Sequence, residues 1–183
     1  AADLVLAFAG TVTEHTGTIN VTDAPTVAEL KTINAETDGA ITLDVTNGAL
    51  SGSAADLVLA LAGTVTEHTG AITVTDVPLS GAAGVTSLNT ITGETTGVVT
   101  ATISATAAEL ANLTSAATDL VTVTVTDGPT VAELKAINAA TGGAITLNVT
   151  NGALSGSAAD LVLAFAGTVT EHTGTINVTD APT

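Results

Sequence analysis

Residues 53–76 read SAADLVLALAGTVTEHTGAITVTD and contain a helix signal, a turn signal and a strand signal in that order. Ser53 followed by Asp56 is typical of a helix N-terminus, because the serine oxygen can accept from the backbone N–H three residues later. A short apolar run follows, and Gly70 marks a turn. Ile72–Thr75 then alternates apolar and polar residues, which predicts a strand with one buried face. The stretch therefore predicts one small α/β unit.

The same stretch recurs along the 183-residue chain. Residues 1–25 are identical to residues 158–182, and residues 26–53 return 104 positions later with four changes. Repetition at a period of about 20–50 residues is the signature of repeat architectures. Helix starts of the form Ser/Thr-x-Ala-Asp/Glu-Leu, with one degenerate unit between them, place repeats near residues 1, 26, 53, 80, 106, 130 and 157. We expect residues 1–183 to form one array of repeats of about 26 residues, uncapped at both ends.

Each repeat begins with a helix signal. Thr26 and Glu29 predict a capping box, in which each side chain bonds to the backbone N–H of the other residue. The same arrangement is expected at Ser53 and Asp56, Thr106 and Glu109, Thr130 and Glu133, and Ser157 and Asp160. Val27, Leu30 and Ile33 fall on one face of the first of these helices. A helix this short is not stable alone, so that face must pack on something else.

Alternating strands supply the packing partner. They are expected at Ile41–Thr46, Ile72–Thr75, Val121–Thr126 and Ile145–Thr150. Helix and strand in regular alternation favour parallel strands joined by right-handed crossovers. We therefore expect an α/β fold, a right-handed solenoid whose coils each contain a short helix and a parallel β-strand. The alternative is an all-β parallel β-helix, in which the TVAELK segments are corners.

Composition and charge exclude several functions. The chain has 2 basic and 18 acidic residues, a net charge of −16, and no Cys. Nucleic acids and anionic membrane surfaces are bound through clustered Lys and Arg, so neither is expected as a partner. No apolar run approaches the roughly 20 residues that span a bilayer, so no membrane insertion is expected. Disulfides do not contribute to this fold.

A Glu-His pair recurs as Glu14-His15, Glu67-His68 and Glu171-His172. A metal ion needs its ligands within bonding distance of one point. Copies two or more coils apart cannot meet this condition, because neighbouring strands are about 4.8 Å apart. We interpret the pair as a polar loop sequence copied by duplication.

Acidic residues at the predicted strand ends are the only candidate metal ligands. They are Asp23, Asp76, Asp127 and Asp180, with Asn47 and Asn151 at two further strand ends. Carboxylates in a ladder can bind Ca²⁺. The glycine-rich nonapeptide of calcium β-rolls is absent, and the two Asn dilute the charge. Turn capping is the main interpretation, weak Ca²⁺ binding is the alternative, and no other cofactor is expected.

Threonines at the outward strand positions define a candidate face. This face comprises Thr42, Thr46, Thr73, Thr75, Thr100, Thr102, Thr122, Thr124, Thr146 and Thr150. Rows of T-x-T resemble those of ice-binding solenoids, although Asn20, Asp44, Asn148 and Asn177 interrupt them. Threonine is also a residue that exposed strands favour. The face therefore predicts a surface that is solvated or meets a partner.

Nothing in the sequence predicts an enzyme. There is no nucleophile elbow, P-loop or dinucleotide-binding glycine pattern. Gly81–Gly84 is expected to be a loop. Nucleophilic catalysis has no cluster of serine, histidine and acid on which to assemble.

The phrases TVAELKTINAETDGAITL, TVAELKAINAATGGAITL and SAADLVLAFAG resemble the tandem-repeat arrays of giant secreted or surface proteins of bacteria, cyanobacteria especially. The resemblance covers essentially the whole chain and carries no functional residue with it. It implies an adhesin or fibre segment, extracellular or at the cell surface. The expected function is a structural or adhesive rod that can assemble end to end into a filament. Its partners would then be copies of itself or neighbouring repeats of a longer chain. The alternative is a module that binds ice, glycan or mineral through the threonine face.

Overall fold

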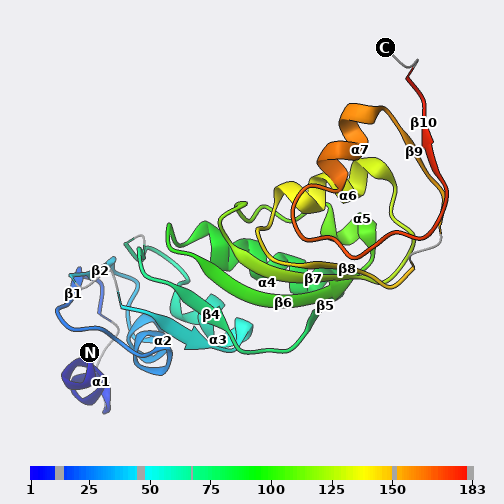
Figure 1. The fold of residues 1–183 in the computed structure, drawn as a ribbon. Helices are drawn as coiled ribbons and strands as arrows, with labels where there is room; N and C mark the ends of the chain where they lie inside the picture. The colour runs from blue at the N-terminus through cyan, green and yellow to red at the C-terminus, as the bar shows by residue number, and fades with distance from the viewer. Residues whose placement is uncertain (11–14, 45–47, 67, 150–151, 181–183) are drawn as a thin grey trace. The chain divides into compact units, whose positions relative to one another are not determined.

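The computed structural model describes residues 1–10, 15–44, 48–66, 68–149 and 152–180. Short helices alternate with short strands, and the strands pair mostly in parallel (Figure 1). The fold is therefore α/β, with no closed barrel among the described strands. The chain forms two compact units, residues 1–76 with 90–99 and residues 77–89 with 100–183.

Residues 1–76 of the first unit contain seven elements in chain order. They are α1 (Ala2–Phe8), β1 (Ile19–Val21), α2 (Val27–Ala35), β2 (Ile41–Leu43), β3 (Leu50–Gly52), α3 (Ala54–Ala60) and β4 (Ile72–Val74). The capping box predicted for α2 is present. Thr26 Oγ1 accepts from the Glu29 N–H at 3.2 Å, and Glu29 Oε2 accepts from the Thr26 N–H at 2.9 Å. Because the TVAELK segment is helical, the all-β alternative is wrong.

The second unit contains most of the remaining elements. They are β5 (Leu79–Ser80), α4 (Gly81–Gly93), β6 (Val99–Ala105), α5 (Ala107–Leu110), β7 (Leu120–Val125), α6 (Val131–Ala139), β8 (Ile145–Leu147), β9 (Leu154–Gly156), α7 (Ala158–Ala164) and β10 (Ile176–Val178). The last residues of α4 and the first residue of β6 belong to the first unit. Within the second unit α6 and α7 pack on each other (Figure 1).

The loop expected at Gly81–Gly84 is wrong, because these residues form the first turn of α4. Gly81 has a φ of +58°, a left-handed conformation that favours glycine and turns the chain from β5 into the helix. A Cβ at Gly84 would lie 3.1 Å from the Cβ of Leu79. The small residues therefore let the helix start directly against the strand.

Strand pairing differs from a stack of equivalent positions. Ile72 of β4 lies opposite Leu50 of β3, not opposite Ile41. Ile41 of β2 lies opposite Ile19 of β1, and it forms an isolated bridge with Val65. β3 and its duplicate β9 escape sequence-based detection because each has one apolar residue in only three positions. Neighbouring repeats therefore pair through two separate strand segments, as β1 pairs with β2 and β3 pairs with β4, rather than through one strand per repeat.

The core is aliphatic and alternates with polar side chains, as predicted. In β7, Val121, Val123 and Val125 are fully buried, whereas Thr122 between them is exposed. The apolar face predicted for α2 is buried too, with Leu30 and Ile33 at 0% exposure. Burial of each such side chain is worth about 1.5–3 kcal/mol.

A Thr-x-Gly step brings neighbouring repeats into backbone contact. Thr95 Oγ1 donates to the His68 carbonyl at 2.8 Å and accepts from the Gly97 N–H at 2.9 Å. A Cβ at Gly97 would overlap the carbonyl oxygen of Gly70. Thr37 and Gly39, and Thr141 and Gly143, make the same step. The buried threonine and the glycine thus fix how closely two segments approach.

Candidate functional site

The predicted threonine face lies only partly in solvent. Thr73, Thr75, Thr100 and Thr122 are exposed. Thr42, Thr102, Thr124 and Thr146 are half-buried. Thr46 and Thr150 lie outside the described residues.

Register brings the threonines together best in the second unit. Thr124 of β7 has Ser104 of β6 on one side and Thr146 of β8 on the other. Ser80 of β5 lies opposite Ser104, so the row contains four hydroxyls. Thr102 lies opposite Thr122 in a second, shorter row. In the first unit Thr73 lies opposite Ser51, which is also a pair of hydroxyls, whereas Thr42 lies opposite Asn20. The second unit presents two adjacent hydroxyl rows.

Exposed Leu120 lies in the same sheet, opposite Thr100. Its side chain is 51% exposed. The face is therefore a mixed surface of hydroxyls and one apolar side chain.

The strand-end aspartates, which were the calcium candidates, accept hydrogen bonds at helix N-termini. Asp127 Oδ1 accepts from the backbone N–H of Ala107 at 2.7 Å. Both Asp180 carboxylate oxygens accept from the N–H of Ala158 at 3.0 Å. In the same way Asp76 accepts from the Ala54 N–H, whereas Asp23 forms an ion pair with the terminal ammonium of Ala1. Each aspartate thus serves a helix N-terminus 20 or 22 residues earlier, where the dipole favours a carboxylate.

Two side chains share each helix start. Ser157 Oγ accepts from the Asp160 N–H at 3.1 Å, while the Ala158 N–H goes to Asp180. Of the backbone N–H groups that have no acceptor within the helix, that of Asp160 bonds to the nearby Ser157, and that of Ala158 bonds to Asp180 in the following repeat. Our main interpretation of these acids was turn capping. It did not include the helix N–H groups as partners, because they lie in another repeat.

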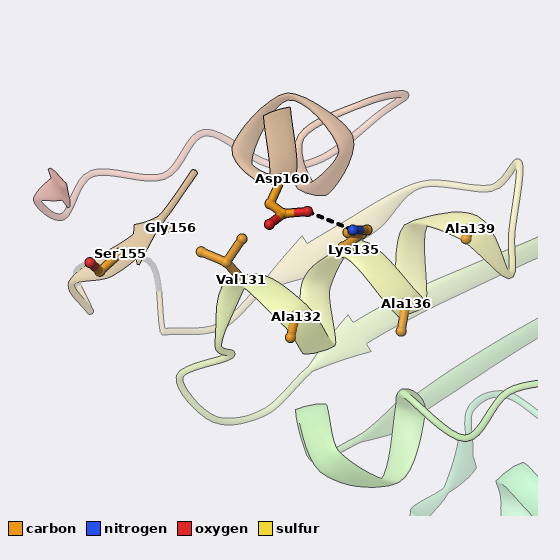
Figure 2. Close-up of a pocket in the computed structure, with 8 residues that line it drawn as sticks. All are labelled: Val131, Ala132, Lys135, Ala136, Ala139, Ser155, Gly156 and Asp160. Carbon is orange, nitrogen blue, oxygen red and sulfur yellow. Dashed lines mark hydrogen bonds and ion pairs between the residues drawn. The ribbon is translucent and has the colours of Figure 1, made fainter. Parts of the chain in front are cut away.

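Lysine joins consecutive helices. Lys135 Nζ of α6 lies 2.5 Å from Asp160 Oδ1 of α7, and Figure 2 shows the two groups pointing toward each other. Lys31 of α2 makes the same ion pair with Asp56 of α3. The hydrogen bond from Lys135, and then that from Ser157, holds the pKa of Asp160 below its ordinary value. Sequence reasoning missed the pair, although both lysines have an aspartate 25 positions later.

Asparagine joins the other ends of the same helices. Asn34 Nδ2 donates to the carbonyl oxygens of Leu59 at 2.8 Å and Ala62 at 2.9 Å. Asn138 Nδ2 donates to the carbonyl oxygen of Leu163 at 2.8 Å. Carbonyls in the last turn of a helix lack intrahelical partners, so these amides complete the helix C-terminus.

The Glu-His copies do not form one site. Glu14 and Glu67 lie outside the described residues, and Glu171 is exposed. His68 is only 2% exposed, and its Nε2 lies 2.6 Å from the Gly48 carbonyl oxygen. Since a carbonyl only accepts, this nitrogen must be the one that donates. The polar-loop interpretation is therefore wrong for His68, which is a buried link between repeats.

His172 repeats this contact with the Gly152 carbonyl oxygen at 2.7 Å. His15 is exposed. Two of the three histidines thus make the same contact, whereas the exposed His15 has a different environment.

A groove of about 500 Å³ lies beside α6 and α7 (Figure 2). Its lining is mostly small and apolar, and its charged groups are Lys135 and Asp160, which pair with each other. The lining residues are Val131, Ala132, Lys135, Ala136, Ala139, Ser155, Gly156 and Asp160.

Among the described residues, no three His, Asp or Glu side chains lie close enough to hold a metal ion together. In the same part of the chain, no helix combines the length and the apolar character needed to cross a bilayer. No family model, curated protein or solved structure matches this chain.

Proposed function

We propose that this chain is a structural and adhesive rod segment of an extracellular or cell-surface repeat protein. Its coils of about 26 residues, each with a short helix and parallel strand, stack as a right-handed solenoid. The rod acts as an extension, as a spacer or as a unit of a larger assembly. Its partners are copies of itself or neighbouring repeats of a longer chain. The main support is the recurrence of the same side-chain contacts between one repeat and the next.

These contacts occur at one spacing in both units. Lys31 reaches Asp56 and Lys135 reaches Asp160, each 25 positions later. The asparagine bonds to the following helix span 25 positions in each unit as well. Nearest-neighbour contacts of one kind are what stabilise a repeat array, and they let it grow without a new core.

Charge and side-chain use support a mechanical role. Most of the perturbed carboxylates bind helix N-termini or lysine, so they are occupied by the fold. A net charge of −16 keeps copies apart at low salt and lets them approach when salt screens the repulsion. We propose no enzymatic activity for the chain.

A length series tests this proposal. Residues 53–156 form one 104-residue period, and a second copy can be inserted after Gly156 without changing any local junction. We expect each inserted period to add a constant increment to the longest dimension measured by small-angle X-ray scattering. Growth of the radius of gyration with the ~0.38 power of chain length, as in a compact domain, would contradict the rod.

The second candidate is a surface-binding module, favoured by the row Ser80–Ser104–Thr124–Thr146 on adjacent strands. Regular hydroxyls can bind ice, glycan or mineral. Thermal hysteresis and retention of the chain in growing ice test the ice version. Thr124→Asp should abolish both effects, whereas Thr75→Asp, away from these rows, should leave them unchanged. An inactive parent chain would exclude ice.

A further inference from the structure

The sheet of the second unit has an outward face without charged side chains. Its two hydroxyl rows are Ser80–Ser104–Thr124–Thr146 and Thr102–Thr122. Thr100 and Leu120 lie opposite each other at the next level along β6 and β7. Exposed Asn148 lies two positions beyond Thr146. We call these residues the hydroxyl face, and none of the 18 acidic and 2 basic residues of the chain belongs to it.

The acidic residues that adjoin this face along the chain have partners within the fold. Asp127, which follows β7, accepts from the first backbone N–H of α5 at 2.7 Å. Glu109, which follows β6, accepts within its own capping box. Asp119, which precedes β7, accepts from the Ala116 N–H at 2.8 Å and is 5% exposed. The flanking acids are therefore engaged at helix starts or buried.

The duplicated strand in the first unit is not neutral in this way. Thr42 and Asp44 there correspond to Thr146 and Asn148, 104 positions later. Asp44 and Asn148 are both exposed, so the difference removes a surface charge. The copy without the charge is the one whose strand, β8, pairs with β7 and extends the hydroxyl rows.

A surface of this chemistry fits a second copy of itself. Each hydroxyl both donates and accepts, so two hydroxyl rows can bond to each other in either direction. A partner that brought a charge onto the face would lose the hydration of that charge without gaining a counter-ion. A second hydroxyl face brings no charge.

We propose that the hydroxyl face docks on the hydroxyl face of a second copy of this chain. The contact is isologous, with the same patch on both partners, so it joins two rods laterally and then closes. The proposal rests on the proposed function, because it names the surface through which the rod meets copies of itself. Leu120, which is 51% exposed, supplies apolar area that docking removes from water.

Size and charge predict when this contact forms. A standard interface uses about 20–30 residues on each side, many more than the hydroxyl face has, so the pairing of single faces is weak. The net charge of −16 repels a second copy. The Debye length falls from about 30 Å at 0.01 M salt to about 3 Å at 1 M, so salt should favour the pair.

Sedimentation over a range of concentrations tests the contact on the full chain. We expect a monomer at about 0.01 M NaCl and a reversible monomer–dimer equilibrium at about 1 M NaCl. Thr122→Asp places a charge in the shorter row, so it should raise the dissociation constant of the dimer by about tenfold or more.

Thr114→Asp is the matched control. It adds the same charge at an exposed loop position of the same unit, outside the hydroxyl face. Its dissociation constant at high salt should stay within about twofold of the parent value, because a charge outside the contact is screened. Unchanged circular dichroism of Thr122→Asp would show that its loss of the dimer is not unfolding.

An introduced thiol locates the contact by a second measurement. The chain has no cysteine, so each single-cysteine variant carries one thiol per copy. A short bismaleimide should join Thr122→Cys to its own copy at about 1 M NaCl, and much less at about 0.01 M. Thr114→Cys should not be joined under either condition.

Three results would overturn this docking. They are an unmodified chain that stays monomeric at high salt, equal effects of Thr122→Asp and Thr114→Asp, and equal crosslinking of the two cysteine variants. Retention of a monomeric chain in growing ice, lost in Thr122→Asp, would assign the same face to ice instead. The length series, measured on monomeric Thr122→Asp, distinguishes failure of this docking from failure of the rod.

Discussion

Asn138 of α6 donates its side-chain N–H to the carbonyl oxygen of Leu163 in α7, 2.8 Å away. One repeat thereby completes the C-terminal hydrogen bonding of the next helix. Lys135, one turn earlier on α6, binds the acidic N-terminal turn of the same helix. Helix α6 therefore contacts both ends of α7, so loss of either contact should weaken the packing of these two helices.

Replacement of the asparagine should show its contribution directly. We expect Asn138→Ala to lower the free energy of unfolding by about 0.5–1.5 kcal/mol, because the Leu163 carbonyl loses a donor. Urea denaturation would measure the change. Asn148→Ala, at an exposed position, is the matched control and should stay within about 0.5 kcal/mol of the parent. Equal effects of the two substitutions would contradict a stabilising role for the hydrogen bond from Asn138 to Leu163.

The aspartate at the end of β7 should behave as a helix cap. Asp127→Ala should cost about 1 kcal/mol, because the Ala107 N–H at the start of α5 loses its acceptor. Asp127→Asn keeps an oxygen and should retain part of this stability. Thermal unfolding with and without millimolar calcium would separate the two interpretations of this residue. A rise in Tm with calcium that Asp127→Ala abolishes would support weak calcium binding at this residue.

Acid should destabilise the fold through its capping and paired carboxylates. Asp160, Asp56, Glu29 and Glu109 all have pKa values lowered by hydrogen bonds, the first two chiefly from lysine and the others from Thr26 and Thr106. A carboxyl with a lowered folded-state pKa binds its proton less readily in the folded state than in the unfolded state. Its contribution is complete above the unfolded pKa of about 4 and is lost as pH falls through the folded value.

Removal of the lysine isolates one of these groups. Lys135→Met should raise the pKa of Asp160 toward its ordinary value, which NMR titration of the carboxyl would measure. The Lys31→Met variant should leave Asp160 unchanged, because Lys31 pairs with Asp56. A titration of Asp160 that ignores Lys135 would contradict the ion pair.

The glycine of the Thr-x-Gly step should not tolerate a side chain. Gly97→Ala would place its Cβ on the Gly70 carbonyl oxygen, so the two backbones must separate. We expect a loss of about 1–3 kcal/mol or more. Gly93→Ala is the control, because a Cβ at the end of α4 meets nothing within 4 Å. That substitution should be neutral or stabilising by up to about 1 kcal/mol.

Sequence reasoning predicted the features that local chemistry controls. The helix start at Thr26 follows from two side chains three positions apart, and the alternation in β7 follows from a period of two. It failed where the partner lies in another repeat. β3 has too few apolar residues to be predicted as a strand from the sequence. It forms a strand because β4 pairs with it.

The candidate sites show the same division. Seven of the ten predicted face threonines lie on described strands, whereas Thr75 lies just past the end of β4, and Thr46 and Thr150 lie outside the described residues. The rows that these threonines form depend on a register that one sequence does not contain. His68 was interpreted as a loop residue because its sequence neighbours are polar, whereas its environment comes from Gly48 and Thr95. Asp127 was assigned to a turn because it follows a strand. The sequence around it does not show that it accepts from the start of a helix twenty positions earlier.

The Thr-x-Gly step also limits how duplicated copies can diverge. Residues 91–100 differ from residues 33–42 at half of their positions, yet they retain the hydroxyl of Thr95 and the bare backbone of Gly97 where two backbone segments touch. After a gene duplication, outward positions can mutate with little consequence for folding. At the step, almost any new side chain would force two layers apart, so the room for evolutionary drift differs from one position to the next.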